Sequence, residues 1–133
     1  MSDRVYDLQG IRVFEFAAAG APPTNSRDAT ELIGAARSQQ AELAVIPAAR
    51  LGDEFFRLKT GIAGEIIQKF VTYQVRLVIV GDIPRYLLES SALRDLVYES
   101  NHGTNVWFLP DLQSLASRLV QCAAGRLAAT RKP

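Results

Sequence analysis

The chain is poor in the side chains that most often bind metals or carry out redox chemistry. Its 133 residues include one cysteine, Cys122, and one histidine, His102. One cysteine cannot form a disulfide within the chain, and a structural zinc site needs about four Cys or His ligands. Cys122 falls near the apolar stripe of the last predicted helix, where a small buried side chain is expected. We therefore expect no metal, no cofactor and no disulfide.

The chain also lacks a strong charge of one sign and a long apolar run. Fifteen Lys and Arg face fourteen Asp and Glu, which gives a formal net charge of +1. No basic stripe with interleaved aromatic residues indicates nucleic-acid binding. No run approaches the roughly 18 apolar residues of a membrane span, and residues 1–10 lack the apolar stretch of a signal peptide. These features predict a cytoplasmic protein with no nucleic-acid partner and no membrane partner.

What the sequence does contain is enough apolar residues for one packed α/β domain over residues 1–133. Hydrophobic residues make up 48% of the chain and charged residues 22%, as in globular domains. Two alternating runs around Gln9-Gly10 predict a β-hairpin, and later apolar runs between helical segments predict buried strands. The predicted elements are strands at 4–8, 11–16, 43–46, 75–80 and 105–109, and helices at 26–40, 61–70, 87–100 and 112–127.

These elements predict a mixed, mostly parallel sheet of about five strands with an N-terminal β-hairpin and four helices. Ser26 is the expected N-cap of the first helix, and Gly103 the expected left-handed C-cap of the third. Residues 53–58 are expected to form a helical turn. Trp107 is expected in the core or at a half-buried edge, and residues 128–133 should fray.

The stretch from Lys59 to Gly64 is the first candidate site. Gly61 and Gly64 open a helix after a loop, and helix N-termini expose amide groups that favour anions. Lys59 adds a positive charge and Thr60 a hydroxyl, so the stretch predicts an anion-binding or phospho-acceptor site. The alternative is that Thr60 caps the helix and that both glycines allow close helix packing.

Polar residues after the later strands and helices form a second candidate, a pocket or partner surface. Gly81-Asp82 follows the most apolar strand, and ligands of open α/β sheets gather at that edge. The alternatives are a plain turn after the strand, a capped helix end near residues 99–103, and an exposed ion pair between Glu65 and Lys69. The candidate residues are Arg50, Glu65, Asp82, Arg85, Tyr86, Glu99, Asn101 and His102.

Three runs carry a resemblance to a known family: FFRLKTGIAGEIIQKF at 55–70, VRLVIVGD at 75–82 and LRDLVYESNHG at 93–103. With them the chain closely resembles the bacterial domain-of-unknown-function family 4180 over about residues 5–120. That family brings no activity that can be transferred to this chain.

The layout is also similar, more distantly, to STAS domains, the fold of anti-sigma factor antagonists. In those proteins an Asp-Ser-Ser-Gly-Leu loop leads into a helix, and a partner kinase phosphorylates the serine before the glycine. The resemblance places that serine on Thr60, the glycine on Gly61 and the leucine on Ile62. The acid and the first serine fall on Leu58 and Lys59, which departs from the STAS pattern.

From these features we expect a non-enzymatic regulatory or protein-interaction domain with a STAS-like fold, switched by anion binding or phosphorylation near Thr60. The resemblance implies a protein partner, and a homodimer is an option because the edge strands of small sheets often pair. The alternative is a small-molecule-binding protein or a small enzyme with a pocket at the C-terminal edge of the sheet.

Overall fold

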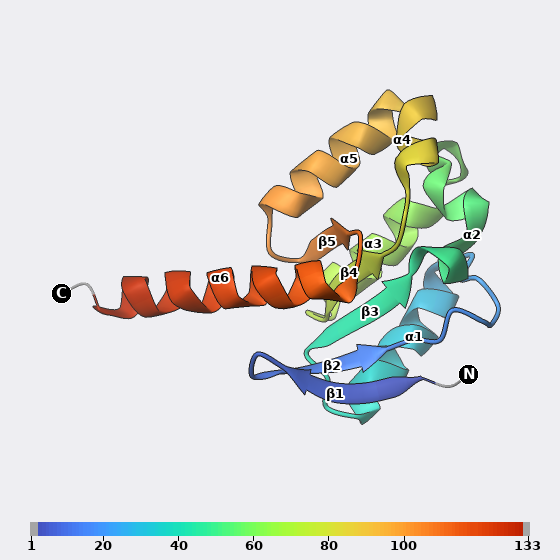
Figure 1. Ribbon diagram of the computed structural model, residues 1–133. Coiled ribbons are helices and arrows are strands. Elements are labelled where there is room, and N and C mark those ends of the chain that lie inside the picture. The colour runs from blue at the N-terminus through green and yellow to red at the C-terminus, as the bar shows by residue number, and fades with distance from the viewer. Residues whose placement is uncertain (1–2, 132–133) are drawn as a thin grey trace.

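The computed structural model describes the backbone of residues 3–131 and the side chains up to residue 121. Within residues 3–131 the chain forms five strands, six α-helices and one short 3-10 helix (Figure 1). The strands are β1 (Arg4–Leu8), β2 (Ile11–Glu15), β3 (Leu43–Pro47), β4 (Arg76–Val80) and β5 (Val106–Leu109). The helices are α1 (Ser26–Ser38), α2 (Ala48–Phe56), η1 (Leu58–Thr60), α3 (Ile62–Thr72), α4 (Pro84–Glu89), α5 (Ser91–His102) and α6 (Leu112–Arg131).

The sheet is mixed, and its strands follow the order β1-β2-β3-β4-β5. β1 pairs antiparallel with β2, and the other neighbours are parallel. The hairpin closes at Gln9 and Gly10, which both have positive φ angles, 52° and 80°. A two-residue type I′ turn needs this conformation at both positions. The predicted α/β class, hairpin and mostly parallel sheet are confirmed.

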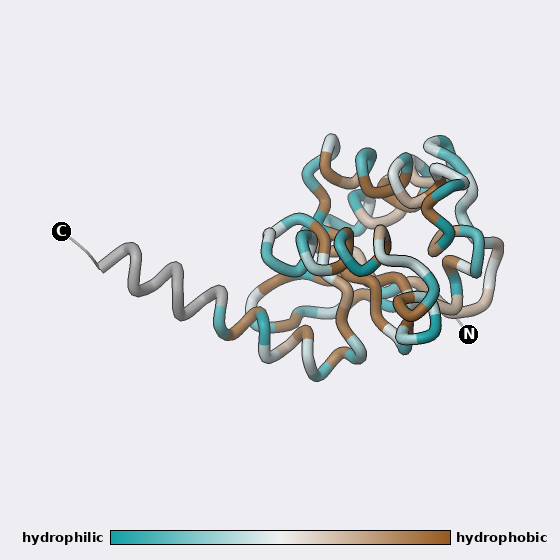
Figure 2. The backbone as a smooth tube through the Cα atoms, turned by 90° about the horizontal axis from the view of Figure 1, so that it is seen from above, coloured by the Kyte–Doolittle hydropathy of each residue, from teal (hydrophilic) through white to brown (hydrophobic). Residues whose placement is uncertain are grey.

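The two faces of the sheet are covered unequally. α1, α2, α3 and α5 pack on one face, against side chains that include Phe14, Ile46 and Ile79. The other face is covered by α6 (Figure 1). Leu115 and Leu119 of this helix pack against side chains that include Val45 and Trp107. Successive residues of a strand point to opposite faces, so one apolar run supplies both layers. Coloured by hydropathy, the backbone is most hydrophobic in the middle of the molecule (Figure 2).

Two predicted helix ends are wrong. The N-cap of α1 is Asn25 and not Ser26, because the Asn25 side chain accepts a hydrogen bond from the Asp28 amide at 2.9 Å. Gly103 after α5 is not left-handed: its φ and ψ are −97° and −165°. The chain leaves this helix extended, and the Gly103 carbonyl accepts a hydrogen bond from the Trp107 indole at 2.7 Å. Both ends are fixed by neighbouring residues that the local pattern did not single out.

The described residues contain two more α-helices than the four expected. The predicted helix at 87–100 is two helices, α4 and α5, which meet at Ser90. The Ser90 hydroxyl accepts a hydrogen bond from the Leu93 amide at 3.1 Å, so Ser90 is the N-cap of α5. The expected turn at 53–58 is divided: residues 53–56 belong to a longer helix, α2, which begins directly after β3, and Leu58 begins η1.

Trp107 lies in the core as predicted, with 1% of its surface exposed. The predicted burial of Cys122 concerns a side chain outside the described ones, and the fraying of residues 128–133 stays a prediction. No helix within residues 3–131 combines the length and the apolar character that crossing a membrane requires.

Candidate functional site

Two adjoining hollows lie where β3 and β4 end and α4 faces α2 and η1. The first, which we call the α4 cleft, has a volume of about 420 Å³ and lies between η1 and α4. The second, the strand-end hollow, has a volume of about 550 Å³ and includes Val80 and Gly81 at the end of β4. Arg85 and Tyr86 line both. The charged and hydroxyl-bearing residues of the α4 cleft are Asp53, Arg57, Lys59, Thr60, Arg85, Tyr86, Glu89 and Ser90.

A kink in α2 shapes the wall of the α4 cleft. Gly52 has a φ of 78° and a ψ of 170°, which is not helical and which side chains other than glycine rarely adopt. Beyond the kink, Phe55 and Phe56 are buried in the core, while Asp53 and Glu54 remain exposed. The two phenyl rings therefore fix the turn, and the two carboxylates face outward beside the cleft.

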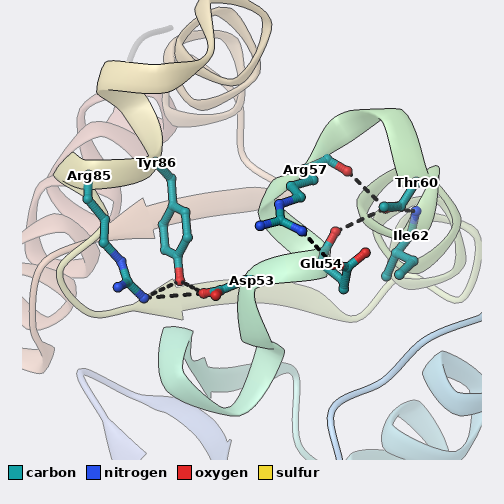
Figure 3. A network of polar contacts seen from close by, with 7 residues as sticks. All are labelled: Asp53, Glu54, Arg57, Thr60, Ile62, Arg85 and Tyr86. Atoms are coloured by element: carbon teal, nitrogen blue, oxygen red, sulfur yellow. Dashed lines mark hydrogen bonds and ion pairs between the residues drawn. The ribbon is translucent and has the colours of Figure 1, made fainter.

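Asp53 joins α2 to α4 through two side chains of α4 (Figure 3). The Tyr86 hydroxyl and Nη2 of Arg85 both donate to Oδ1 of Asp53, the guanidinium at 3.2 Å. Nη2 of Arg85 also donates to the Tyr86 oxygen at 2.6 Å. The Tyr86 ring stacks on the Phe56 ring, with 4.4 Å between centroids and 11° between planes. We call Asp53, Arg85 and Tyr86 the latch.

Two of the three latch side chains are exposed to solvent, and Tyr86 is half-buried. The side chains of Arg85 and Asp53 keep 72% and 59% of their surface accessible. Exposed ion pairs contribute about 0–1 kcal/mol, so this pair holds the two helices only weakly. Burial raises the pKa of Tyr86, and the hydrogen bond to Asp53 raises it further. Tyr86 is therefore a neutral hydroxyl donor at physiological pH.

Three cationic side chains line the α4 cleft, against the two carboxylates of Asp53 and Glu89. Arg85 is bound to Asp53, and Arg57 pairs with Glu54 at 2.8 Å. Lys59 makes no ion pair with any described side chain. The cleft thus offers an uncommitted ammonium group beside two exposed guanidinium groups.

The Thr60 hydroxyl is turned toward the backbone. Its oxygen lies 2.9 Å from the Glu54 carbonyl and 2.8 Å from the Arg57 carbonyl, and it accepts a hydrogen bond from the Ile62 amide at 3.3 Å. Ile62 is the first residue of α3, so Thr60 satisfies a donor at the start of that helix. The N-cap position of α3 is Gly61, so the alternative in which Thr60 is the N-cap is wrong, although its hydroxyl contacts the first amide of the helix.

No neighbouring element among the described residues packs closely against the two glycines of this stretch. A Cβ atom at Gly61 or Gly64 would meet none of the described neighbours within 4 Å. Gly61 instead occupies the left-handed region, with a φ of 78°, between η1 and α3. The packing alternative for these glycines is therefore wrong.

Arg50 holds a loop and does not line the α4 cleft. Its guanidinium donates to the carbonyls of Ala17, Ala19 and Ala21 at 2.9, 3.3 and 3.0 Å. These three bonds fix the segment between β2 and α1 against α2. Arg50 is one of the predicted pocket residues, but its partners are backbone groups about 30 residues away.

Glu65 lies apart from the cleft, in a separate hollow of about 230 Å³ on α3. Lys69 lines the same hollow, but the predicted ion pair between the two side chains is wrong, because no contact within 4.0 Å joins them. Neither residue lines the α4 cleft or the strand-end hollow.

Glu99, Asn101 and His102 lie at the end of α5 away from α4. The Asn101 amide bridges the backbone of Phe108: its nitrogen donates to the carbonyl at 3.2 Å, and its oxygen accepts from the amide at 2.7 Å. Nδ1 of His102 lies 2.7 Å from the Tyr98 carbonyl of its own helix. Asn101 and His102 thus serve the local structure and are not part of the cleft.

The structure therefore brings together Lys59, Thr60, Arg85 and Tyr86 in the α4 cleft, and it places Asp82 in the adjoining strand-end hollow. Sequence reasoning missed Asp53, Phe56 and Arg57 as site residues. The contacts of Asp53 and Phe56 with α4 span about 30 residues, and no local pattern indicates them. One feature of the sequence could have indicated a site here: two acidic residues, Asp53 and Glu54, follow Gly52 within an otherwise mostly apolar stretch.

Comparison with known proteins gives a family for the chain. A model of the family described as Domain of unknown function (DUF4180) matches residues 8–119. The match runs from the last residue of β1 to Leu119, the last buried residue of α6 among the side chains described up to residue 121. The predicted resemblance to this family, over about residues 5–120, is confirmed. No curated protein and no solved structure matches the chain.

Proposed function

The chain belongs to the DUF4180 family, and we propose that it is a non-enzymatic domain that binds a small anionic molecule in the α4 cleft. One observation carries the proposal: three cationic side chains, Arg57, Lys59 and Arg85, line a hollow of about 420 Å³. The volume lies within the range of about 300–1,000 Å³ typical of small-molecule sites. The position also agrees, because ligands of open α/β sheets bind beyond the carboxyl ends of the strands.

The cleft supplies both charge and hydrogen-bond donors. Lys59 is free to pair with an anion, and charge-assisted hydrogen bonds are about twice as strong as neutral ones. Tyr86 and Ser90 add hydroxyl groups at the α4 side. The one histidine of the chain lies at the far end of α5, so these groups favour binding over acid–base catalysis.

Isothermal titration calorimetry with inorganic phosphate, pyrophosphate, succinate and citrate tests the proposal. We expect at least one of these anions to bind and the Lys59→Gln variant to bind it about tenfold more weakly, since a hydrogen bond to a charged group contributes about 1.5–3 kcal/mol. Lys69→Gln is the matched control, because it removes the same charge from α3 outside the cleft. Equal affinity in wild type and Lys59→Gln would contradict the proposal.

The second candidate is a regulatory domain of STAS-like type that binds a protein partner. Exposed apolar side chains on the two helices α4 and α5 favour it: Leu88 on α4 is 83% exposed and Tyr98 on α5 is 66% exposed. A phosphate on Thr60 would add about 1.5–2 negative charges at the start of α3. The hydroxyl would first have to leave the Glu54 and Arg57 carbonyls.

A comparison of two substitutions at Thr60 tests that switch. Thr60→Glu places a negative charge where a phosphate would lie, and Thr60→Val removes the hydroxyl without adding charge. We expect only Thr60→Glu to change capture of a partner in a pull-down from the native host. Equal capture by wild type and both variants would count against a switch at Thr60.

Native mass spectrometry of the purified protein separates the two candidates at the outset. A retained anionic mass would favour the binding protein, whereas an apo monomer or dimer would favour the regulatory domain. The same spectrum reads the subunit number and so tests the proposed homodimer. The proposed cytoplasmic location is tested separately, by fractionating cells that carry a tagged copy.

A further inference from the structure

We propose that the Asp53 carboxylate occupies the position of the ligand's own carboxylate, so that an acidic ligand binds by displacing Asp53 from Arg85 and Tyr86. The inference rests on the proposed anion-binding function of the α4 cleft. It specifies the chemical class of the ligand, a small dicarboxylate. It also makes Asp53 an internal competitor that lowers the affinity of the cleft for this ligand.

The donors of the latch are arranged as a carboxylate receptor. A guanidinium nitrogen of Arg85 and the Tyr86 hydroxyl converge on one oxygen, Oδ1 of Asp53, from the same side (Figure 3). Arginine pairs with carboxylates through such planar, charge-assisted hydrogen bonds. A carboxylate of a ligand in the cleft can meet the same two donors, because both residues line it.

Asp53 is held weakly enough to be exchanged. Its side chain is 59% exposed, and its bonds run to a partner that is 72% exposed. An exposed pair of this kind contributes about 0–1 kcal/mol, which a ligand with a second contact can exceed. Water can solvate the released Asp53 carboxylate, since no buried surface has to be opened.

The receptor side stays in place when Asp53 leaves. The Tyr86 ring remains stacked on Phe56, and the Phe56 side chain is buried in the core. The guanidinium carbon of Arg85 lies 4.6 Å from the Tyr86 ring centroid, so the arginine is held by the same ring. The two donors are therefore positioned by the stack and not by Asp53.

The second carboxylate of the ligand has its own partner. Lys59 lines the same cleft and makes no ion pair with any described side chain. A ligand with two carboxylates can thus replace Asp53 with one and bind Lys59 with the other. A ligand with a single carboxylate would only replace one exposed ion pair, Asp53 with Arg85, by another of similar strength. We therefore expect the ligand to need two acidic groups.

Calorimetric titration with succinate, using succinamide as its uncharged counterpart, tests the inference. We expect succinate but not succinamide to bind, and Asp53→Asn to bind succinate at least about threefold more tightly because the competitor has lost its charge. Glu89→Gln removes a carboxylate from the same cleft that is not part of the latch, so it measures the general electrostatic gain, which we expect to be smaller. In an Arg85→Gln background, Asp53→Asn should bring no more than this general gain.

The remaining outcomes show whether this inference, the proposed function or both have failed. If Asp53→Asn did not raise the affinity for succinate, or raised it no more than Glu89→Gln does, Asp53 would not be an internal competitor. Weaker binding by Lys59→Gln would still support anion binding in the cleft. Binding of phosphate without binding of succinate would overturn the carboxylate class. Failure of all four anions to bind either wild type or Asp53→Asn would overturn both. Asp53 is exposed, and circular dichroism confirms folding of each variant.

Discussion

Arginine side chains lie against the rings of Tyr6, Tyr86 and Trp107. The last two places differ in how their hydrogen-bond donors are used. At Trp107 the guanidinium carbons of Arg76 and Arg118 lie 4.7 and 4.3 Å from the ring centroid. Main-chain carbonyls accept from all three side chains: Thr104 from Arg76, Asn101 from Arg118 and Gly103 from the indole. The acceptors of this cluster are main-chain carbonyls, which a ligand cannot replace.

At Tyr86 the hydrogen-bond acceptor is a side-chain carboxylate and not a main-chain carbonyl. Arg85 lies 4.6 Å from the Tyr86 ring, but both residues donate to the exposed Asp53 carboxylate. Trp107 is 1% exposed, whereas the Arg85 side chain is 72% exposed. Similar chemistry thus builds structure where the acceptors are fixed carbonyls and offers a receptor where the acceptor is a movable carboxylate.

Trp107→Ala should show the largest effect on stability. The indole fills the core under α6, and large-to-small changes of this kind cost about 3–5 kcal/mol in unfolding free energy. Urea denaturation followed by circular dichroism measures the loss. Trp107→Phe should cost less, because it keeps most of the buried ring. A loss below that of Tyr86→Ala would break the comparison between the two clusters.

Asn101→Ala should have the second-largest effect. Its amide satisfies both the amide and the carbonyl of Phe108, so the substitution leaves two part-buried backbone groups without partners. An unsatisfied buried group costs about 1–3 kcal/mol. Hydrogen exchange of the Phe108 amide should accelerate strongly in the variant. Succinate affinity should stay unchanged, and a loss of binding would return Asn101 to the candidate site.

Tyr86→Ala and Tyr86→Phe separate the stack from the hydroxyl. Tyr86→Ala removes the stack on Phe56 and should cost about 0.5–1.5 kcal/mol beyond the lost buried area. Tyr86→Phe keeps the ring and should leave the urea midpoint close to that of wild type while it weakens succinate binding. A large stability loss in Tyr86→Phe would show that the latch is structural, like the Trp107 cluster.

The titration of Tyr86 should show the smallest effect. Burial and the hydrogen bond to Asp53 raise its pKa, so the folded protein keeps this proton at a pH where the unfolded chain loses it. The resulting stabilisation is complete below about pH 10 and is lost as the pH rises through the folded pKa. In Asp53→Asn the pKa of Tyr86 should fall toward its ordinary value. Alkaline titration of the Tyr86 Cζ resonance measures it, and an unchanged pKa would contradict the contact.

Local patterns were enough to predict the sheet, but they were not enough to predict the interruptions of the helices. Runs such as residues 75–80 are apolar because both faces of the strand are buried, so they mark strands directly. The break at Ser90 was missed because apolar side chains continue at helical spacing across it. Ser90 was one polar residue among several, and its role as a cap depends on the chain turning there.

The candidate site was predicted in part, for a similar reason. The strand-end rule singled out Asp82, Arg85 and Tyr86, and the helix-start rule Lys59 and Thr60; the structure places all five along the two hollows. Asp53 was not found, because its pairing with Arg85 depends on how α2 and α4 pack. Asn101 was predicted to lie in a site because it is polar, whereas its two bonds to Phe108 show a role in the fold.

The position of α6 in the chain has a consequence for biosynthesis. In residues 3–131, the strands are completed at Leu109, yet the face that holds Val45 and Trp107 is packed by Leu115 and Leu119. A ribosome makes these two leucines after every strand has been made. The nascent chain therefore carries an uncovered apolar face until α6 emerges, and exposed surface of this kind is where chaperones bind and where unfinished chains aggregate. A chain that stopped near Pro110 would keep that face open permanently.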